Sequence, residues 1–215
     1  LAVGVLLLGL VSTARADLTT GLVAWYPFDG NASDMSGNGR HGTLHGSVAL
    51  SADRHGVANK AYVFDGQNDY IELNNPSIIG TRSTFSIFAW VKCPVDANQS
   101  SNSIYGEFHT PGDATRNYFL ISNKSLNLDQ YPPGNGPSAS SESVLNFEYW
   151  DFVGVTRNGT TCNLYLDGTT VSSGSNAETF DGSNPNKSYI GARGAGTSTH
   201  RLNHFHPEPY GRHEN

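Results

Sequence analysis

Short runs of alternating apolar and polar residues, separated by turn-forming residues, constrain this chain more than any other feature. The clearest example is WDFVGVTRNGTTCNLYLDGTTVSS, from Trp150 to Ser173. Its Asn-Gly pair at 158–159 and Asp-Gly pair at 167–168 favour the positive φ angles of tight hairpin turns. In the middle run, TCNLYL, successive side chains alternate between an apolar and a polar face. This stretch therefore predicts a three-stranded antiparallel meander.

The same pattern recurs along most of the chain, and almost no segment has the spacing of a helix. The predicted strands are Leu22–Phe28, Ser47–Ser51, Ala61–Phe64, Tyr70–Leu73, Phe85–Lys92, Ser103–Glu107, Tyr118–Ser122, Ser125–Asp129, Trp150–Arg157, Thr161–Leu166, Thr169–Ser173 and Tyr189–Ala192. A dozen short strands in one domain predict an all-β protein, a two-sheet antiparallel β-sandwich.

The run TFSIFAWVKC carries apolar residues on both of its faces, with Phe88 and Trp90 opposite the set that contains Ile87 and Val91. Two apolar faces are typical of a central strand that is covered on both sides. Trp90 is a candidate platform for a sugar ring, although tryptophan more often lies in a core.

Residues 1–16 resemble a secretory signal peptide. An apolar run from Leu1 to Val11 precedes Ala14-Arg15-Ala16, which fits the small-x-small pattern of a cleavage site. The run is shorter than the roughly 20 apolar residues that span a bilayer. The chain has a net charge of −6 and 15% charged residues. We therefore expect a secreted, extracellular protein that neither inserts into a membrane nor binds nucleic acid.

The chain contains two cysteines, Cys93 and Cys162. Outside the cytoplasm such a pair is a candidate disulfide. Both residues, however, fall on the apolar face of their predicted strands, where a reduced cysteine behaves as a small hydrophobic residue. The sequence leaves both alternatives open.

The glycine-rich stretch FDGNASDMSGNGRHGTLHG has the composition of either a metal site or a sharp turn. Asp34, Ser36 and Asn38 follow the spacing of the first half of a calcium loop, but the glutamate that would close an EF-hand is replaced by His45. A hard cation such as Ca²⁺ would need a further oxygen ligand, and Asp69 is the candidate. The alternative is a hairpin in which Asp and Asn cap their own turns.

Five segments together resemble the LamG-like jelly-roll modules of the concanavalin A-like lectin and glucanase superfamily. They are GLVAWYPFDGNASDMSGNGRHGTLHG, AYVFDGQNDYIEL, STFSIFAWVK, YWDFVGVTRNGTTCNLYLDGTTV and YIGAR, in order from Gly21 to about Arg193. The resemblance implies a jelly roll over residues 17–199, usually found as an appendage of exported bacterial proteins. It also implies carbohydrate binding or adhesion, commonly with one bound calcium ion.

Residues 200–215 do not match the resemblance. Family members typically close with a strand of the form G-x-I-D-E-V-x-I-Y-N, whereas this chain has HRLNHFHPEPYGRHEN. We therefore expect a disordered or frame-shifted tail, and a sandwich without its last strand. An unfilled strand position would leave backbone groups of its neighbours unpaired.

Function follows from the resemblance and from motifs that are missing. None of the glutamates begins the E-x-D-x-x-E motif of the related glucanases, and no segment resembles the motifs of alginate lyases. We predict no catalytic residues and expect a carbohydrate-binding or adhesion module, for which a glycan or an extracellular matrix or surface protein is the partner. Tyr105, Arg116, Tyr118 and Tyr131 are the candidate ligand-binding residues. The alternatives are a polysaccharide-degrading enzyme and a structural spacer or protein-binding domain of a larger surface protein.

Overall fold

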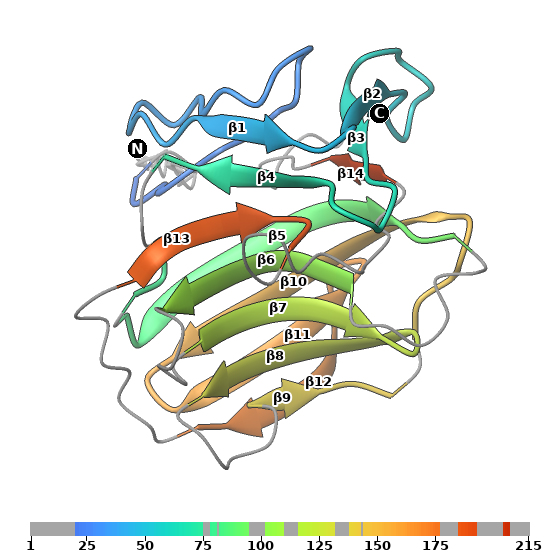
Figure 1. Cartoon of the computed structure of the whole chain (residues 1–215). Helices are drawn as coiled ribbons and strands as arrows, with labels where there is room; N and C mark the ends of the chain where they lie inside the picture. The colour runs from blue at the N-terminus through green and yellow to red at the C-terminus, as the bar shows by residue number, and fades with distance from the viewer. Residues whose placement is uncertain are drawn as a thin grey trace, which may run out of the picture.

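Two antiparallel sheets packed face to face make up the fold (Figure 1). The computed structural model describes residues 20–74, 78–80, 82–94, 102–109, 116–131, 138–142, 144–176, 185–192 and 204–206. These residues contain no helix, and therefore none that could cross a membrane. The predicted all-β class and two-sheet sandwich are confirmed.

The first sheet has the order β1-β4-β13-β6-β7-β8-β9. Its strands are β1 (Gly42–His45), β4 (Tyr70–Leu73), β6 (Asn102–His109), β7 (Arg116–Ser122), β8 (Ser125–Tyr131), β9 (Ala139–Ser140) and β13 (Pro185–Ile190). Within this sheet, the longest uninterrupted ladder joins β7 to β8, which are connected by a two-residue turn at Asn123 and Lys124, both with positive φ.

The second sheet has the order β12-β11-β10-β5-β14-β3-β2. Its strands are β2 (Ala49–Ser51), β3 (Ala61–Val63), β5 (Thr84–Lys92), β10 (Trp150–Asn158), β11 (Thr161–Leu166), β12 (Thr169–Ser175) and β14 (His204–His206). The meander predicted from Trp150 to Ser173 is present as β10, β11 and β12. Its second turn lies at the expected Asp167-Gly168 pair, whereas the first lies one residue later than expected, at Gly159 and Thr160, because Asn158 still pairs with Thr161.

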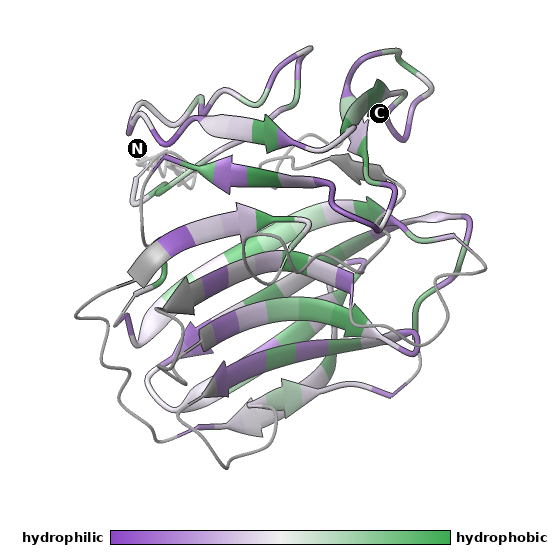
Figure 2. Cartoon of the chain, viewed as in Figure 1, coloured by the Kyte–Doolittle hydropathy of each residue, from purple (hydrophilic) through white to green (hydrophobic). Residues whose placement is uncertain are grey.

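The core lies between the two sheets and consists of the inward-facing half of each strand. Figure 2 shows hydrophobic and hydrophilic positions alternating along the central strands. Phe119 and Leu128 from the first sheet meet Val155 and Leu164 from the second, and all four are fully buried. Each such side chain contributes roughly 1.5–3 kcal/mol of transfer free energy.

The segment Leu22–Phe28, predicted to be a strand, is not one in the structure. Its apolar side chains do face the interior, since Tyr26 and Phe28 belong to the core. A strand also requires a neighbour for its backbone, however, and the structure places no strand beside Leu22–Tyr26 among the described residues. The alternating pattern correctly predicted burial, but no strand of the described residues pairs with this segment.

The tail differs in part from the expectation. Three of its residues, His204–His206, form β14 and occupy a position inside the second sheet, between β5 and β3. Phe205 lies opposite Val91 of β5 and Tyr62 of β3. The position expected to lack a strand is therefore filled over three residues. The N-terminal segment 1–16 lies outside the described residues.

Candidate functional site

Four aromatic side chains gather on the outer face of the second sheet: Phe88, Trp90, Phe152 and Tyr165. Their strand neighbours Ala89, Val91, Val153 and Leu164 belong to the core. Because successive side chains of a strand point to opposite sides, the four aromatic residues face away from the core. We call this set the aromatic face. It crosses the three adjacent strands β5, β10 and β11.

The rings of the aromatic face contact one another in a continuous series. The centroids of Trp90 and Phe152 are 5.1 Å apart, and those of Phe88 and Phe152 are 5.7 Å apart with nearly parallel planes. Tyr165 continues the series at 6.0 Å from Phe88. These distances fall in the range of favourable aromatic pairs. Phe152 is buried by its neighbours, whereas Phe88, Trp90 and Tyr165 each keep part of their surface exposed.

A glycine makes room for the rings. Gly154 lies opposite both Phe88 and Tyr165 in the sheet register. A Cβ atom at this position would come within 2.3 Å of the Phe88 ring, so the ring lies directly on the Gly154 backbone. The aromatic face is therefore a shallow platform whose rings sit close to the sheet.

A row of small polar side chains runs beside the aromatic face. Ser86, Thr156, Asn163 and Ser173 lie directly opposite one another across β5, β10, β11 and β12. The hydroxyl of Ser173 donates to Oδ1 of Asn163 at 2.7 Å, and the hydroxyls of Thr156 and Tyr165 are 3.2 Å apart. We call these four residues the polar row. Aromatic surface beside hydroxyl and amide groups is the chemistry of a small-ligand site that recognises polar, ring-shaped molecules.

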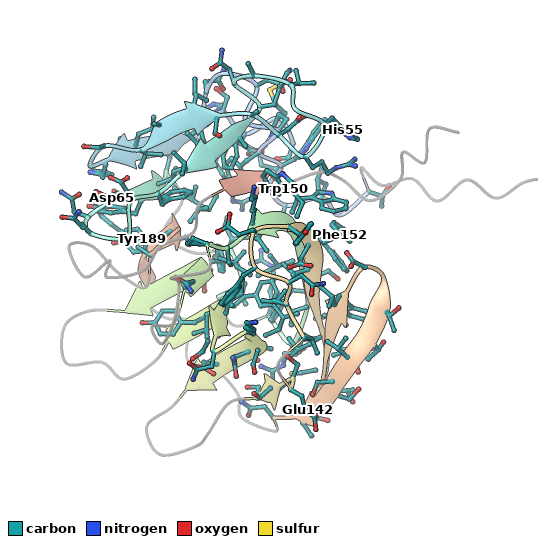
Figure 3. All side chains as sticks on the ribbon, turned by 90° about the vertical axis from the view of Figure 1, so that its right-hand side faces the viewer. His55, Asp65, Glu142, Trp150, Phe152 and Tyr189 are labelled. Carbon is teal, nitrogen blue, oxygen red and sulfur yellow. The ribbon has the colours of Figure 1, made fainter. Side chains whose placement is uncertain are left out.

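Positive charge borders the aromatic face at the opposite side from the polar row. The guanidinium of Arg54 lies 4.4 Å from the centre of the Trp90 ring, a cation–π arrangement. Lys92 and Trp150 lie opposite each other at the next outward-facing position of β5 and β10. Figure 3 shows Trp150 and Phe152 on β10, with His55 in the loop that follows β2.

The four residues predicted to bind ligand do not form this site. Tyr105 and Tyr118 are 6% and 3% exposed, so the expectation that they present open rings to a sugar is wrong. The Tyr105 hydroxyl donates to Glu107 inside the protein. Burial, and next the negative charge of Glu107, raise the pKa of Tyr105. Arg116 and Tyr131 lie opposite each other in β7 and β8, and their side chains lie outside the described part of the structure.

Asp34, one of the four predicted metal ligands, caps its own loop. Its Oδ1 accepts hydrogen bonds from the N–H groups of Trp25 at 3.0 Å and Ser36 at 2.9 Å, and its Oδ2 from that of Arg40 at 2.9 Å. Burial alone would raise the pKa of Asp34, but these hydrogen bonds outweigh it and lower the pKa. The carboxylate is buried and its charge is already compensated by backbone donors.

The other predicted ligands also have protein partners. Asp69 accepts hydrogen bonds from the N–H groups of Ser47 and Asp65, which places it in a different turn. Asn38 donates to the carbonyl groups of Leu22 and Val23. Within the described ranges, no three His, Cys, Asp or Glu side chains come together as a metal site. These contacts fit turn capping rather than a calcium cage, and they do not test the calcium binding that the family resemblance implies.

The loop instead holds the N-terminal segment. Besides the two bonds from Asn38, the Val23 carbonyl accepts from Nη1 of Arg40 at 2.6 Å. The N–H of Met35 donates to the Trp25 carbonyl at 2.8 Å. One edge of Leu22–Trp25 is therefore attached to the glycine-rich loop by several hydrogen bonds.

Of the two alternatives that the sequence leaves open for the cysteines, the structure has the reduced pair rather than the disulfide. Cys93 and Cys162 are free and buried. Cys162 lies opposite Arg157, which in turn lies opposite Phe85 at the start of β5. Cys93 follows the other end of β5, about 26 Å away at roughly 3.3 Å per residue. A disulfide requires Cα atoms closer than about 7 Å.

The sequence pattern predicted only part of the aromatic face. Alternation correctly placed Phe88 and Trp90 on one side of their strand. Phe152 and Tyr165 join them only through the register of β5 with β10 and of β10 with β11. That register is a long-range property, and two candidate strands do not reveal it.

Comparisons with known proteins agree with this architecture. Domain 4 of the GH43 extracellular arabinanase AbnA from Geobacillus stearothermophilus, solved with arabinotriose, has a TM-score of 0.65 at 19% identity, over 86% of this chain and 88% of that one. The binding domain of Paraclostridial Mosquitocidal Protein 1 has a TM-score of 0.65 at 16% identity, over 90% of this chain and 50% of that one.

A third similar structure is the CBM40 of the Ruminococcus gnavus IT-sialidase bound to alpha2,3 sialyllactose. It has a TM-score of 0.51 at 11% identity, over 60% of this chain and 75% of that one. At these identities the likeness shows the fold. No curated protein matches the sequence.

The family model of the concanavalin A-like lectin/glucanases superfamily matches residues 65–202. This range covers most of the chain and includes β4 to β13. It also contains all four residues of the aromatic face. The chain therefore belongs to the concanavalin A-like lectin/glucanases superfamily.

Proposed function

We propose that this protein is a secreted, non-catalytic carbohydrate-binding module that binds an oligosaccharide on the aromatic face. The observation that carries the proposal is the arrangement of Phe88, Trp90 and Tyr165 beside the polar row. The apolar C–H faces of a sugar ring pack on aromatic rings, and its hydroxyl groups exchange hydrogen bonds with Ser, Thr and Asn. Here the two kinds of surface lie in adjacent rows of one sheet.

The similar structures support this class of function. Two of them were solved with an oligosaccharide, arabinotriose in one case and sialyllactose in the other. The third is named as a binding domain. A binding role shared by several modules of one fold supports a binding role for this chain, and the aromatic face supplies the site.

A non-catalytic role fits the surroundings of the site. The outward-facing positions of β5 and β10 hold Thr, Ser, Phe, Trp, Lys, Gly and Asn, without a carboxylate. Glycoside hydrolysis needs two carboxyl groups flanking the bond that is cleaved. Asp151, the acidic residue of β10, points to the opposite side of its sheet and is buried.

The test is a glycan array probed with wild-type protein, followed by calorimetry on any ligand found. We expect Trp90→Ala and Tyr165→Ala each to weaken binding by about five- to tenfold, since an aromatic–sugar contact contributes on the order of 1–1.5 kcal/mol. Tyr149→Ala is the matched control. Tyr149 is 71% exposed and lies outside the aromatic face.

The results distinguish an error in the location of the binding site from an error in the proposed carbohydrate-binding role. Binding that is lost with Tyr149→Ala and kept with Trp90→Ala would move the site away from the aromatic face. An array without any bound glycan, from a protein that is folded by circular dichroism, would refute the carbohydrate-binding role.

A further inference from the structure

Two cations lie at one end of the aromatic face, Arg54 and Lys92, and we call them the basic pair. The guanidinium of Arg54 lies 4.4 Å from the centre of the Trp90 ring. Lys92 follows Trp90 by two residues in β5, so both side chains leave the same side of the sheet, with their backbones roughly 7 Å apart. Both members of the basic pair are therefore neighbours of Trp90.

Hydrogen bonds fix the loop that carries Arg54. Oδ1 of Asp53 accepts from the N–H groups of His55 at 2.9 Å and Val57 at 2.8 Å, and the N–H of Asp53 donates to the Val57 carbonyl at 3.0 Å. Arg54 lies inside this turn and is half-buried. Because the loop and the Trp90 ring hold the guanidinium in place, binding of a ligand to it costs little conformational entropy.

The sheet positions the other cation, Lys92. It lies opposite Trp150 of β10 and is half-buried. A lysine in such a position packs its aliphatic stem on apolar surface and keeps its ammonium group in water. The ion pairs of the described residues involve His45, Lys60 and Lys187, and Lys92 takes part in none of them. Its positive charge is therefore available to a ligand.

The acidic residues around the basic pair leave this charge in place. The carboxylate of Asp53 caps its own turn, as described above. Asp167 accepts a hydrogen bond from the N–H of Phe152 at 3.0 Å and lies beyond β11, roughly 10 Å from β5 at the usual spacing of strands. Glu148, in the loop before β10, is exposed to water, which screens its charge. The aromatic face is thus positive over β5, and its one neighbouring turn at Asp167 is negative.

The basic pair contrasts with the charge of the whole chain. The net charge is −6, so the overall field of the protein does not attract a polyanion. A preference for an anionic ligand has to come from local contacts. A neutral sugar finds its hydrogen-bond partners in the polar row, whereas an anionic sugar also interacts with the basic pair.

We propose that the aromatic face selects oligosaccharides whose sugars carry an anionic group, either a carboxylate or a sulfate ester. This inference rests on the carbohydrate-binding role proposed above and names its ligand class. A sugar ring packs on the exposed part of Trp90, and its anionic group accepts hydrogen bonds from Arg54 and Lys92. The five N–H donors of a guanidinium lie at its edge, so they bind an anion while its planar face stays on the ring. The neighbouring sugars extend over Phe88 toward the polar row.

The test compares matched pairs of oligosaccharides on the whole chain by calorimetry. Oligogalacturonate, oligomannuronate and hyaluronan oligosaccharides carry carboxylates, and carrageenan oligosaccharides carry sulfate esters. Each is paired with its carboxyl-reduced or desulfated form, which keeps the linkages and loses the charge. We expect at least one anionic form to bind about tenfold or more tightly than its neutral form, because hydrogen bonds to charged groups are the stronger ones. The difference should shrink in about 1 M salt, where the Debye length is about 3 Å.

Substitutions of the basic pair locate the anionic group. Arg54→Gln and Lys92→Gln should each weaken binding of the anionic form by roughly fivefold or more and leave binding of the neutral form nearly unchanged. Lys187→Gln is the matched control, because Lys187 is a cation on the first sheet that pairs with Glu72. It should change neither affinity. Circular dichroism checks that each variant is folded.

Each result has a separate meaning. Tighter binding of the carboxylate pairs or of the sulfate pairs identifies which anionic group is recognised. Equal or weaker binding of every anionic form, with neutral oligosaccharides bound, would overturn the anionic preference and retain the carbohydrate-binding role. An anionic preference that survives both Arg54→Gln and Lys92→Gln, or that Lys187→Gln reduces as much, would also overturn it. Only the absence of binding to every oligosaccharide would refute the carbohydrate-binding role itself.

Discussion

The Glu107 carboxylate accepts a hydrogen bond from the backbone N–H of Ile79 at 2.6 Å, although both residues are buried between strands. The N–H groups of Ile78 and Gly80 donate to the same carboxylate. Asn117 donates from its side chain at 3.0 Å. A buried negative charge is expensive unless it is fully hydrogen-bonded, and here successive amides enclose it.

Glu107 and the groups that donate hydrogen bonds to it form what we call the Glu107 cluster, and further hydrogen bonds connect this cluster to the opposite sheet. Gln130 donates to Asn117 at 3.0 Å, and Nη1 of Arg157 donates to Gln130 at 2.9 Å. Arg157 belongs to the second sheet, so this series of hydrogen bonds connects a buried anion on β6 to a buried cation on β10.

Glu107→Gln should therefore destabilise the protein by about 2–4 kcal/mol, because an amide replaces a carboxylate that accepts several charge-assisted hydrogen bonds. Urea denaturation gives the free energy of unfolding. Glu72→Gln is the matched control: Glu72 pairs with the half-exposed Lys187 at the surface, and its loss should cost less than about 1 kcal/mol. Equal stability of both variants would contradict the structural role of the cluster.

Asp151→Asn should stabilise the protein at neutral pH and have little effect in acid. Burial raises the pKa of Asp151 to about 6 from 3.8, a hydrogen bond from the N–H of Asn146 opposes this in part, and the charge of Asp167 adds to it. The native state therefore binds this proton more tightly than the unfolded state. The resulting stabilisation is complete below about pH 4 and is lost as the pH rises through about 6.

Melting curves at pH 4 and pH 7.5 test whether the stability changes with pH in this direction. Relative to wild type, the free energy of unfolding of Asp151→Asn should be higher by on the order of 1–2 kcal/mol at pH 7.5, allowing for solvent screening, and nearly unchanged at pH 4. The exposed Glu142→Gln should change little at either pH. A gain at pH 4 that equals the gain at pH 7.5 would show that titration is not the cause.

Gly154→Ala should disturb the aromatic face without touching a ring directly. The added methyl group would come within 2.3 Å of the Phe88 ring, so the ring must move. Overpacking of this kind costs about 1–3 kcal/mol. In the Phe88→Ala background the space is empty, and the same substitution should cost much less. Thermal denaturation of the two single variants and the double variant measures this coupling. Additive costs would contradict the close contact.

Local pattern was sufficient to predict the strands whose partners are near in sequence. The range Trp150–Arg157 became β10, Trp150–Asn158, because its neighbours in the meander follow directly. For Leu22–Phe28 the same alternation predicted a strand that did not form. Its partner has to come from a distant part of the chain, and no local signal reports whether such a partner exists.

The candidate site was less predictable than the fold for the same reason. Tyr105 and Tyr165 each directly follow an aliphatic residue of a predicted strand, Ile104 and Leu164. The hydroxyl of one enters the core to bind Glu107, and the other lies on the outer face opposite Gly154. Their roles depend on which strands become neighbours, and the sequence of one strand does not contain that information.

Both cysteines should titrate as free thiols. In denaturant, Ellman's reagent should report two thiols per chain without prior reduction, and dithiothreitol should leave the melting temperature unchanged. In the native protein the reaction of Cys93 should be slow, because burial, with a smaller contribution from Asp151, raises the pKa of its thiol to about 12. Fewer than two thiols in unreduced, denatured protein would show that a disulfide forms.

Removal of calcium tests the remaining prediction about the glycine-rich loop. Asp34 already accepts hydrogen bonds from three backbone N–H groups, and these bonds stabilise the conformation of the loop without a metal ion. We therefore expect the same melting temperature in calcium and in chelator, and a loss of about 2–3 kcal/mol in Asp34→Ala under both conditions, because three partly buried N–H groups lose their acceptor. Saturating Ca²⁺ would instead add about 2.7 kcal/mol at a hundredfold excess over Kd if the ion bound only the native state. A rise of that size in wild type, absent from Asp34→Ala, would establish Asp34 as a calcium ligand.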